Sequence, residues 1–147
     1  MASIDKQIMI NASPDRIYNF VIKPSNLTKF WPSIVEIKKE KKLPNGGYCA
    51  QWKYRMSGVY LTGSAQCTDV LINNWFTVKI SGAADCTITW TFRGTEDMGT
   101  KTTLTLDYHL SLPVLRWGAE HIFVKMNNHE ADLVLANLRV LMEEAKV

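Results

Sequence analysis

The strongest constraint on the fold is a two-residue alternation of apolar and polar side chains that recurs in most of the chain. It is clear in "YCAQWKYRM", "WFTVKIS", "CTITWTFRG" and "TLTLDYHLS", and it is the period of a β-strand with one buried face. The links "PNGG", "SG", "NN", "GAAD" and "GTEDMG" are short and rich in turn residues. Short links favour antiparallel neighbours. With a first strand at 3–10, the pattern predicts strands at about 34–42, 48–57, 59–72, 75–81, 86–94 and 100–112.

The last six strands are thus predicted to form a meander within a seven-stranded antiparallel sheet, and the alternation places large apolar side chains on one face of it. From four strands these are Trp52, Tyr54 and Met56; Phe76, Val78 and Ile80; Ile88, Trp90 and Phe92; and Leu104, Leu106, Tyr108 and Leu110. The stretch "VYLTGSAQCTDV" is mixed, and its pattern gives no orientation. A sheet with one apolar face needs a cover on that face.

A long helix at the end of the chain, from Pro113 to about Ala145, is the natural cover. At the helical rise per residue it would run roughly 45 Å. Its main apolar stripe is predicted to be Leu115, Ala119, Ile122, Met126, His129, Leu133, Ala136 and Val140. A second row at helical spacing is Phe123, Glu130, Val134, Leu138 and Leu141.

Two short helices are predicted between the first two strands. Ser13 and Pro14 are typical of a helix start, and Pro24 ends that helix because it disfavours helical geometry at the preceding residue. The second begins at Pro24 or Ser25, reaches about Trp31 and stops at Pro32.

Composition limits the classes of function. The 147 residues suit a single domain, 1–147. A net charge of +3 is too small to indicate a nucleic-acid binder. The basic cluster "KKEKK", Lys38 to Lys42, is interpreted as a solvated strand end, with an anionic membrane surface or headgroup as the alternative. No apolar run is long enough for stable membrane insertion.

The cysteines and the N-terminus point to a cytoplasmic protein. Cys49, Cys67 and Cys86 are an odd number with no CxxC pair, which is typical of free thiols in a reducing compartment. The segment "MASIDKQIMI" has no apolar core of signal-peptide length. We expect no metal and no cofactor, since neither a zinc-like spacing nor a nucleotide-binding motif is present.

The order strand, two short helices, six strands and long helix resembles the START / polyketide cyclase-dehydratase superfamily (SRPBCC, helix-grip fold). The likeness covers the whole chain and is carried by "INASPDRIYNFVIKPSNLTKFWPSIVEI", "GTKTTLTLDYHL" and "NNHEADLVLANLRVLME". These segments mark a fold rather than a reaction. The resemblance implies an α+β fold, with a curved antiparallel sheet wrapped around the terminal helix and a cavity between them. Phe30 and Trp31 would then either anchor the core or plug one end of the cavity.

Candidate chemical residues lie on the last strand and the long helix. Asp107 and His109 share a strand face, but that face is predicted to meet solvent. His129 and Glu130 interrupt apolar rows and are the better acid–base candidates, together with Tyr108. The alternative is that they lie at the edge of the stripe and reach water. Predicted ligand-binding residues are Phe30, Trp52, Tyr54, Met56, Phe76, Val78, Trp90, Phe92, Leu106, Tyr108, Met126 and Glu130.

Three functions remain open on this basis. The first is binding or transport of a small hydrophobic molecule such as a lipid, isoprenoid or polyketide. The second is a cyclase or dehydratase acting in the same cavity, and the third is an interaction or assembly module. The sequence names no protein partner, and fold alone does not decide among the three.

Overall fold

The sheet has the predicted seven strands, all antiparallel to their neighbours. The computed structural model describes residues 2–56, 58–82, 85–109 and 120–144, and leaves out the side chains of 2, 56, 108, 109 and 120–127. The strands are β1 (Ala2–Ile10), β2 (Ile34–Lys42), β3 (Tyr48–Met56), β4 (Val59–Leu71), β5 (Trp75–Gly82), β6 (Asp85–Gly94) and β7 (Thr100–His109). Their order is β1-β7-β6-β5-β4-β3-β2, so β2 to β7 form the predicted meander and β1 pairs with β7. The predicted end of the last strand, 110–112, lies outside the described residues.

The helices are α1 (Pro14–Val21), the 3-10 helix η1 (Pro24–Lys29) and α3 (Glu120–Glu144). Pro14 and Pro24 stand in the first turns of α1 and η1, where a missing N–H costs nothing. The predicted pair of short helices is therefore present, the second as a 3-10 helix. The predicted helical residues 113–119 and 145 lie outside the described part of the chain. Within that part, no helix combines the length and the apolar character needed to cross a bilayer.

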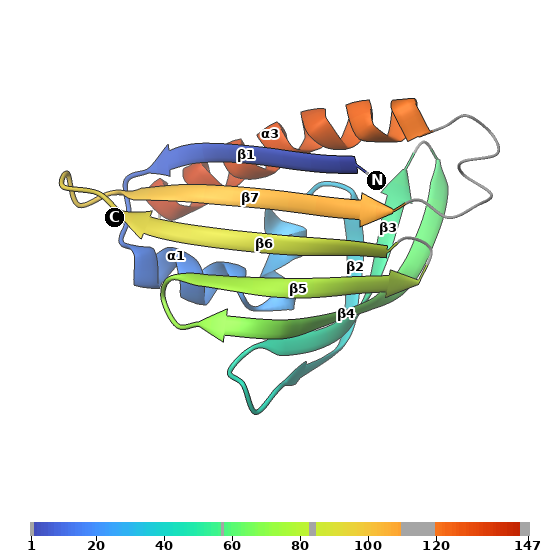
Figure 1. The fold of residues 1–147 in the computed structure, drawn as a ribbon, viewed down its shortest axis with the longest axis horizontal. Helices are drawn as coiled ribbons and strands as arrows, with labels where there is room; N and C mark the ends of the chain where they lie inside the picture. Colours follow the sequence, from blue (N-terminus) through green and yellow to red (C-terminus); the bar gives the residue numbers. More distant parts are fainter. Residues whose placement is uncertain (1, 57, 83–84, 110–119, 145–147) are drawn as a thin grey trace.

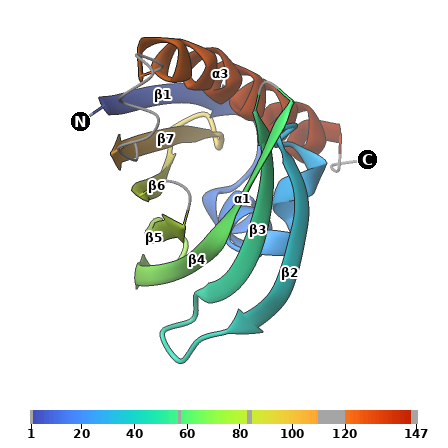
Figure 2. The ribbon, with the colours of Figure 1, turned by 90° about the vertical axis from the view of Figure 1, so that its right-hand side faces the viewer.

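Bulges curve the sheet. In β2 the pairing with β3 shifts twice, between Ile34 and Glu36 and between Lys38 and Lys41, and Lys39 has a positive φ of 53°. The predicted two-residue period is therefore wrong for β2, in which every third residue is partly buried. Bulges bend a strand and increase its twist. Figure 2 shows the result: β2, β3 and β4 turn away from β1 and β7, and α1 lies in the concavity.

The long helix α3 lies along β1, as Figure 1 shows. Its buried side chains are Ala131, Val134, Leu135, Leu138 and Met142. The predicted main stripe is wrong where the structure describes it, because the side chains of His129, Leu133, Ala136 and Val140 are exposed. Of the predicted second row, Val134 and Leu138 are buried and Glu130 and Leu141 are partly buried, while the side chain of Phe123 lies outside the described residues.

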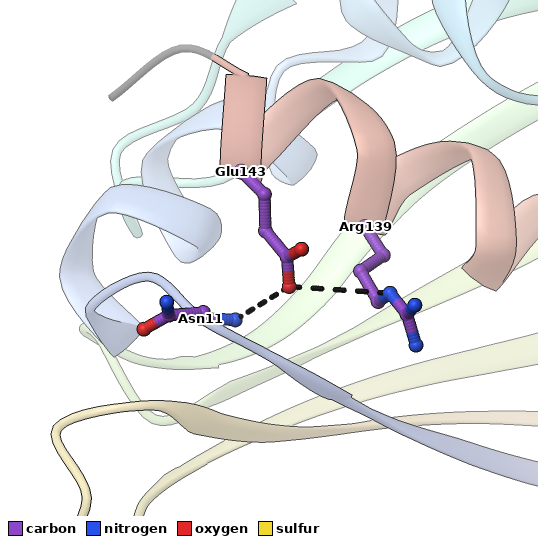
Figure 3. A network of polar contacts seen from close by, with 3 residues as sticks. All are labelled: Asn11, Arg139 and Glu143. Atoms are coloured by element: carbon purple, nitrogen blue, oxygen red, sulfur yellow. Dashed lines mark hydrogen bonds and ion pairs between the residues drawn. The ribbon is translucent and has the colours of Figure 1, made fainter. Parts of the chain in front are cut away.

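The C-terminal end of α3 is tied to the first strand and the first helix. The backbone N–H of Asn11 donates to Glu143 Oε2 at 2.9 Å, and Arg139 Nε lies 3.9 Å from the same oxygen (Figure 3). Arg16 Nη2 donates to the carbonyl oxygen of Met142. The last carbonyls of a helix have no intrahelical partner and carry partial negative charge, so a guanidinium there stabilises the helix end.

Candidate functional site

A partly open cavity of about 160 Å³ lies between the concave face of the sheet and the short helices. The helices and the following loop contribute Val21, Ile22, Pro24, Leu27 and Trp31 to its wall. The sheet contributes Ile34, Ile37, Tyr48, Ala50, Trp52, Tyr54, Leu61, Ala65, Cys67, Phe76, Val78, Ile80, Cys86, Ile88, Trp90 and Leu106. No described residue on this wall has a formal charge at neutral pH.

A bulge in β4 explains why the stretch "VYLTGSAQCTDV" shows no clear alternation of apolar and polar residues. Leu61, Ala65 and Cys67 face the cavity, and they are separated by multiples of two residues, as side chains on one face of a strand are. A bulge then shifts the pairing with β5 between Cys67 and Asp69, so that Val70 rather than residue 69 packs against the core. A bulge adds one residue to the strand, and every later side chain changes face.

A glycine lets one wall residue lie against β4. A Cβ on Gly63 would stand 2.1 Å from the Ser81 carbonyl oxygen and 2.4 Å from the Trp52 ring. Only glycine tolerates so close an approach. The Trp52 indole N–H donates to the Ser64 carbonyl at 3.0 Å, so its polar atom is satisfied and its ring contributes apolar surface to the cavity.

One carboxylate stands at the end of the cavity where Trp31 and Tyr54 form the wall. Glu130 Oε1 accepts the Trp31 indole N–H at 2.6 Å and the Tyr54 hydroxyl at 2.9 Å. Glu130 Oε2 accepts the Ser33 hydroxyl. We call Trp31, Ser33, Tyr54 and Glu130 the carboxylate cluster. Glu130 itself is not on the cavity wall but lies behind Trp31 and Tyr54, which are.

The aromatic segment before β2 is held onto α3 by two polar side chains of that helix. Glu130 binds Trp31, and Asn137 Nδ2 donates to the Phe30 carbonyl oxygen at 3.2 Å. Phe30 is fully buried and packs edge-on against Trp90, with ring centroids 6.2 Å apart. Of the two interpretations of this segment, Phe30 matches a core anchor, while Trp31 is both buried and part of the cavity wall.

The structure brings half of the predicted ligand-binding residues to the cavity wall. These are Trp52, Tyr54, Phe76, Val78, Trp90 and Leu106. Phe30 and Phe92 lie in the packed core. Glu130 lies behind the wall, as described above. The side chains of Met56, Tyr108 and Met126 lie outside the described residues.

The predicted acid–base candidates are separated by the fold. The His129 side chain is exposed, whereas the neighbouring Glu130 is partly buried and hydrogen-bonded. Asp107 alternates with the buried Leu106, is partly exposed, and pairs with Thr87 and Ser3. The side chain of His109 lies outside the described residues.

Several wall residues were missed although a signal for them existed. Tyr48 and Ala50 continue the inward parity of β3 upstream of Trp52. Ile80 and Ile88 belong to the predicted apolar faces but were not selected as ligand contacts. Ser33 had no local signal, because it contacts Glu130 across a separation of 97 residues.

Burial raises the pKa of three acidic groups on the cavity wall. Burial, then the negative charge of Glu130, raises the pKa of the Tyr54 phenol. Burial, then the charge of Asp107, raises the pKa of the Cys86 thiol to about 12. Burial also raises the pKa of the Cys67 thiol. These groups keep their protons when folded, so they add no negative charge to the cavity at neutral pH.

Because the pKa of the Cys86 thiol is raised in the folded protein, we expect the protein to lose stability at alkaline pH. The ordinary pKa of the thiol is 9.0 and its folded pKa about 12, so between these values the unfolded chain releases a proton that the folded chain keeps. The contribution of the protonated Cys86 thiol to the free energy of unfolding is intact below about pH 9. It is lost toward pH 12, at about 1.4 kcal/mol per pH unit. Urea unfolding under reducing conditions is expected to show a shallower alkaline loss for Cys86→Val than for the wild type.

The control for this measurement is Cys49→Val. Cys49 lines a groove on the outer face of the sheet together with Gln51 and Lys79, not the internal cavity. We expect this variant to follow the wild-type pH profile. Equal alkaline slopes for Cys86→Val and the wild type would contradict the prediction.

The described residues of the cavity wall do not form a set of metal ligands. All three cysteines are free thiols. Among the described residues, no three His, Cys, Asp or Glu side chains come together as a metal ion would require. The chemistry that the described wall can supply is apolar contact, together with hydrogen bonding at the carboxylate cluster.

Solved structures share this architecture at low sequence identity. The aromatase/cyclase Zhui from a Streptomyces species matches with a TM-score of 0.86 and 9% identity, covering 99% of this chain and 96% of its own. A START superfamily protein from Mycobacterium smegmatis has a TM-score of 0.80 and 14% identity, covering 97% of this chain and 98% of its own. A protein from Thermus thermophilus has a TM-score of 0.77 and 18% identity, covering 99% and 100%. At such identities the likeness establishes the fold alone.

Sequence comparison identifies the family. No curated protein matches the chain. The model of the family described as "Polyketide cyclase / dehydrase and lipid transport" matches residues 1–143. With the seven-stranded sheet, the long terminal helix and the START-type neighbours, this confirms the predicted resemblance. The chain therefore belongs to the polyketide cyclase/dehydrase and lipid transport family.

Proposed function

We propose that this protein binds a small hydrophobic molecule, of lipid, isoprenoid or polyketide type, in its internal cavity. The observation that carries the proposal is the apolar cavity of about 160 Å³. Protein interiors are close-packed and have few voids larger than a water molecule. An engineered apolar cavity of about 150 Å³ stays dry and binds benzene. A cavity of this size therefore suits a ring or a short branched chain.

The wall chemistry supports an apolar ligand. The wall is mainly aliphatic and aromatic, and its bulkiest members include Trp52, Phe76 and Trp90. Burying apolar surface gains roughly 25 cal/mol per Å². The family description itself joins lipid transport with polyketide cyclisation.

A cyclase or dehydratase is the second candidate, and the carboxylate cluster is what favours it. Glu130 and the Tyr54 hydroxyl are 2.9 Å apart at the cavity end, the distance at which a base and an acid exchange a proton. The sequence offered both Glu130 and His129 as acid–base candidates. In this function Glu130 is the general base. The exposed His129 takes no part.

The binding proposal predicts that filling the cavity weakens binding. Ala65 faces the cavity, whereas Gln66, the next residue on β4, is exposed. We expect Ala65→Trp to weaken binding of a naphthalene probe by at least about tenfold in calorimetric titration. Gln66→Trp is the matched control and should bind within about twofold of the wild type. Equal affinity of both variants, or no binding by the wild type, would refute the proposal.

Mass spectrometry of extracted ligand separates the two candidate functions. Purified protein incubated with a hydroxylated apolar compound is extracted into organic solvent. A binding protein returns the compound unchanged, whereas a dehydratase returns a product that has lost one water molecule.

A further inference from the structure

A second hollow, of about 420 Å³, lies on the outer face of the sheet across β2, β3, β4 and β5, the side turned away from α1 (Figure 2). We call it the outer groove. Its side chains Gln51 and Gln66 are exposed and alternate along their strands with Trp52 and Ala65, which face the cavity. Adjacent side chains of a strand point to opposite faces of the sheet. The outer groove is therefore a site separate from the cavity, with the sheet between them.

The floor of the outer groove is formed by two cross-strand rows. In the first row Lys79 of β5 pairs with Gln66 of β4, which pairs with Cys49 of β3. The second row consists of Ser81, Ser64 and Gln51. Directly opposed residues share a sheet face. The floor therefore presents amides and hydroxyls side by side, and both kinds of group donate as well as accept hydrogen bonds.

Two lysines stand on the outermost strands that line the outer groove. Lys79 is on β5 and Lys39 is on β2, and both side chains are exposed. Because β4 and β3 lie between these strands, the two positions are roughly 14 Å apart at ordinary strand spacing. The described lining includes no aspartate or glutamate, and among the described residues neither lysine has an ion-pair partner.

The surroundings of the outer groove add positive charge. Lys38 and Lys41 pair with groove residues of β3 and share their face, although Lys38 Nζ also lies 3.1 Å from Glu36 Oε1. Asp69 accepts the hydroxyl of the groove residue Thr68 at 3.0 Å but is not itself part of the lining. A cleft lined by charges of one sign raises the local concentration of the opposite ion. The outer groove therefore favours an anionic ligand.

The shape and the side chains of the outer groove narrow the class of anion. Its volume lies in the range of small-molecule sites, roughly 300–1,000 Å³, whereas a flat bilayer surface would not reach the floor of a concave groove. Lysine ammonium groups bind phosphate as point charges. The amides and hydroxyls between Lys39 and Lys79 match a ligand body that carries hydroxyl groups.

We propose that the outer groove binds a hydroxyl-rich small molecule with a phosphate group at each end, of the sugar-bisphosphate class. One phosphate contacts Lys39 and the other contacts Lys79, and the hydroxyl groups of the ligand bind the polar floor between them. This proposal is independent of the apolar ligand proposed for the cavity.

The test uses three probes that share one body: fructose, fructose 6-phosphate and fructose 1,6-bisphosphate. Affinities for the full-length protein are measured by calorimetry at neutral pH and low ionic strength, because salt screens exposed charges. Hydrogen bonds to charged groups contribute enough for each phosphate to raise the affinity by about tenfold. Inorganic phosphate is the reference for adventitious anion binding and should bind more weakly than fructose 6-phosphate.

Two variants remove the lysines of the outer groove one at a time. Lys39→Gln and Lys79→Gln should each lower the affinity for fructose 1,6-bisphosphate by about tenfold, to that of fructose 6-phosphate for the wild type. The matched control is Lys101→Gln. Lys101 is partly exposed on β7, where it alternates with the buried Thr100 and Thr102, and it lies outside the outer groove. This variant should bind the bisphosphate within about twofold of the wild type.

A cysteine on each side of the sheet reports where a probe binds. Cys49 lines the outer groove, whereas Cys86 lines the cavity. Fructose 1,6-bisphosphate should slow the alkylation of Cys49 by iodoacetamide and leave that of Cys86 unchanged, as measured by mass spectrometry of peptides. Naphthalene, the cavity probe, should leave the alkylation of Cys49 unchanged.

The outcomes keep this proposal and the cavity function apart. Equal affinities for the three sugars, inorganic phosphate binding as tightly as the bisphosphate, or unchanged bisphosphate affinity in both lysine variants would refute the groove proposal. Binding to vesicles that contain phosphatidylserine, without binding of the bisphosphate, would also refute it and would assign the lysines to a membrane surface. Loss of naphthalene binding alone would refute only the cavity function.

Discussion

Replacing Trp90 by alanine is expected to lower the free energy of unfolding by about 3–5 kcal/mol, because large-to-small changes in a core lose both transfer energy and packing. Trp90 is 2% exposed. Its ring is stacked on Phe92 at a centroid distance of 6.2 Å and an interplanar angle of 2°, and meets Phe30 edge-on. It also belongs to the cavity wall. Equilibrium unfolding in urea measures the change.

The control for Trp90 is the adjacent Thr91, whose side chain is partly exposed on the other face of β6. Thr91→Ala should change the unfolding free energy by no more than about 0.5 kcal/mol. A loss below about 1.5 kcal/mol for Trp90→Ala would mean that the neighbouring side chains collapse into the vacated space, contrary to a close-packed aromatic core. It would also mean that Trp90 does not define the size of the cavity.

Replacing Glu130 by leucine is expected to cost about 2–3 kcal/mol of unfolding free energy, since donors left without an acceptor lose their hydrogen bonds and stay desolvated. The donors concerned belong to Trp31, Ser33 and Tyr54, on two segments far from α3 in sequence. Glu130→Gln keeps one carbonyl acceptor and should cost less than half as much. Thermal and urea unfolding of the two variants test this order.

The adjacent residue supplies the control for Glu130. His129 is exposed, so His129→Leu should leave stability within about 0.5 kcal/mol of the wild type. Equal effects of the His129 and Glu130 substitutions would show that the carboxylate cluster does not hold the Trp31 segment onto α3. A loss of stability in Glu130→Leu but not in His129→Leu would support that role.

The neighbouring structures illustrate how far fold and function separate. One is an aromatase/cyclase and another a START superfamily protein, yet both superimpose on nearly the whole of this chain. A shared fold supports many chemistries, so function must be argued from the site. Here the described site consists of an apolar wall with the Glu130 carboxylate behind one end, and the experiments above are directed at those features.

The sequence predicted the sheet because strand alternation is a local property. The parity of Trp52 and Tyr54, or of Trp90 and Phe92, follows from neighbours two residues away, and short turns leave little choice of topology. The START-type resemblance also came from sequence, through the Ser13–Pro14 helix start and the aromatic pair before β2. The family match over residues 1–143 confirmed it.

Sequence reasoning failed for the orientation of α3, for a physical reason. Glu130 and Asn137 lie on its partly buried side, so that row looked less apolar than the exposed row with Leu133 and Val140. Their polar groups are satisfied by Trp31 and Phe30. A hydrophobic count cannot anticipate such partners, because they come from about a hundred positions away.

The sequence alone thus determined the strands, the antiparallel meander from β2 to β7 and the covering helix. It also named six residues that the structure places on the cavity wall. Only the tertiary structure decided the bulges in β2 and β4, the buried face of α3 and the carboxylate cluster. Periodicity reports which side of its own element a residue occupies. A cavity and the hydrogen bonds at its end depend on how separate elements meet, and local pattern does not encode that.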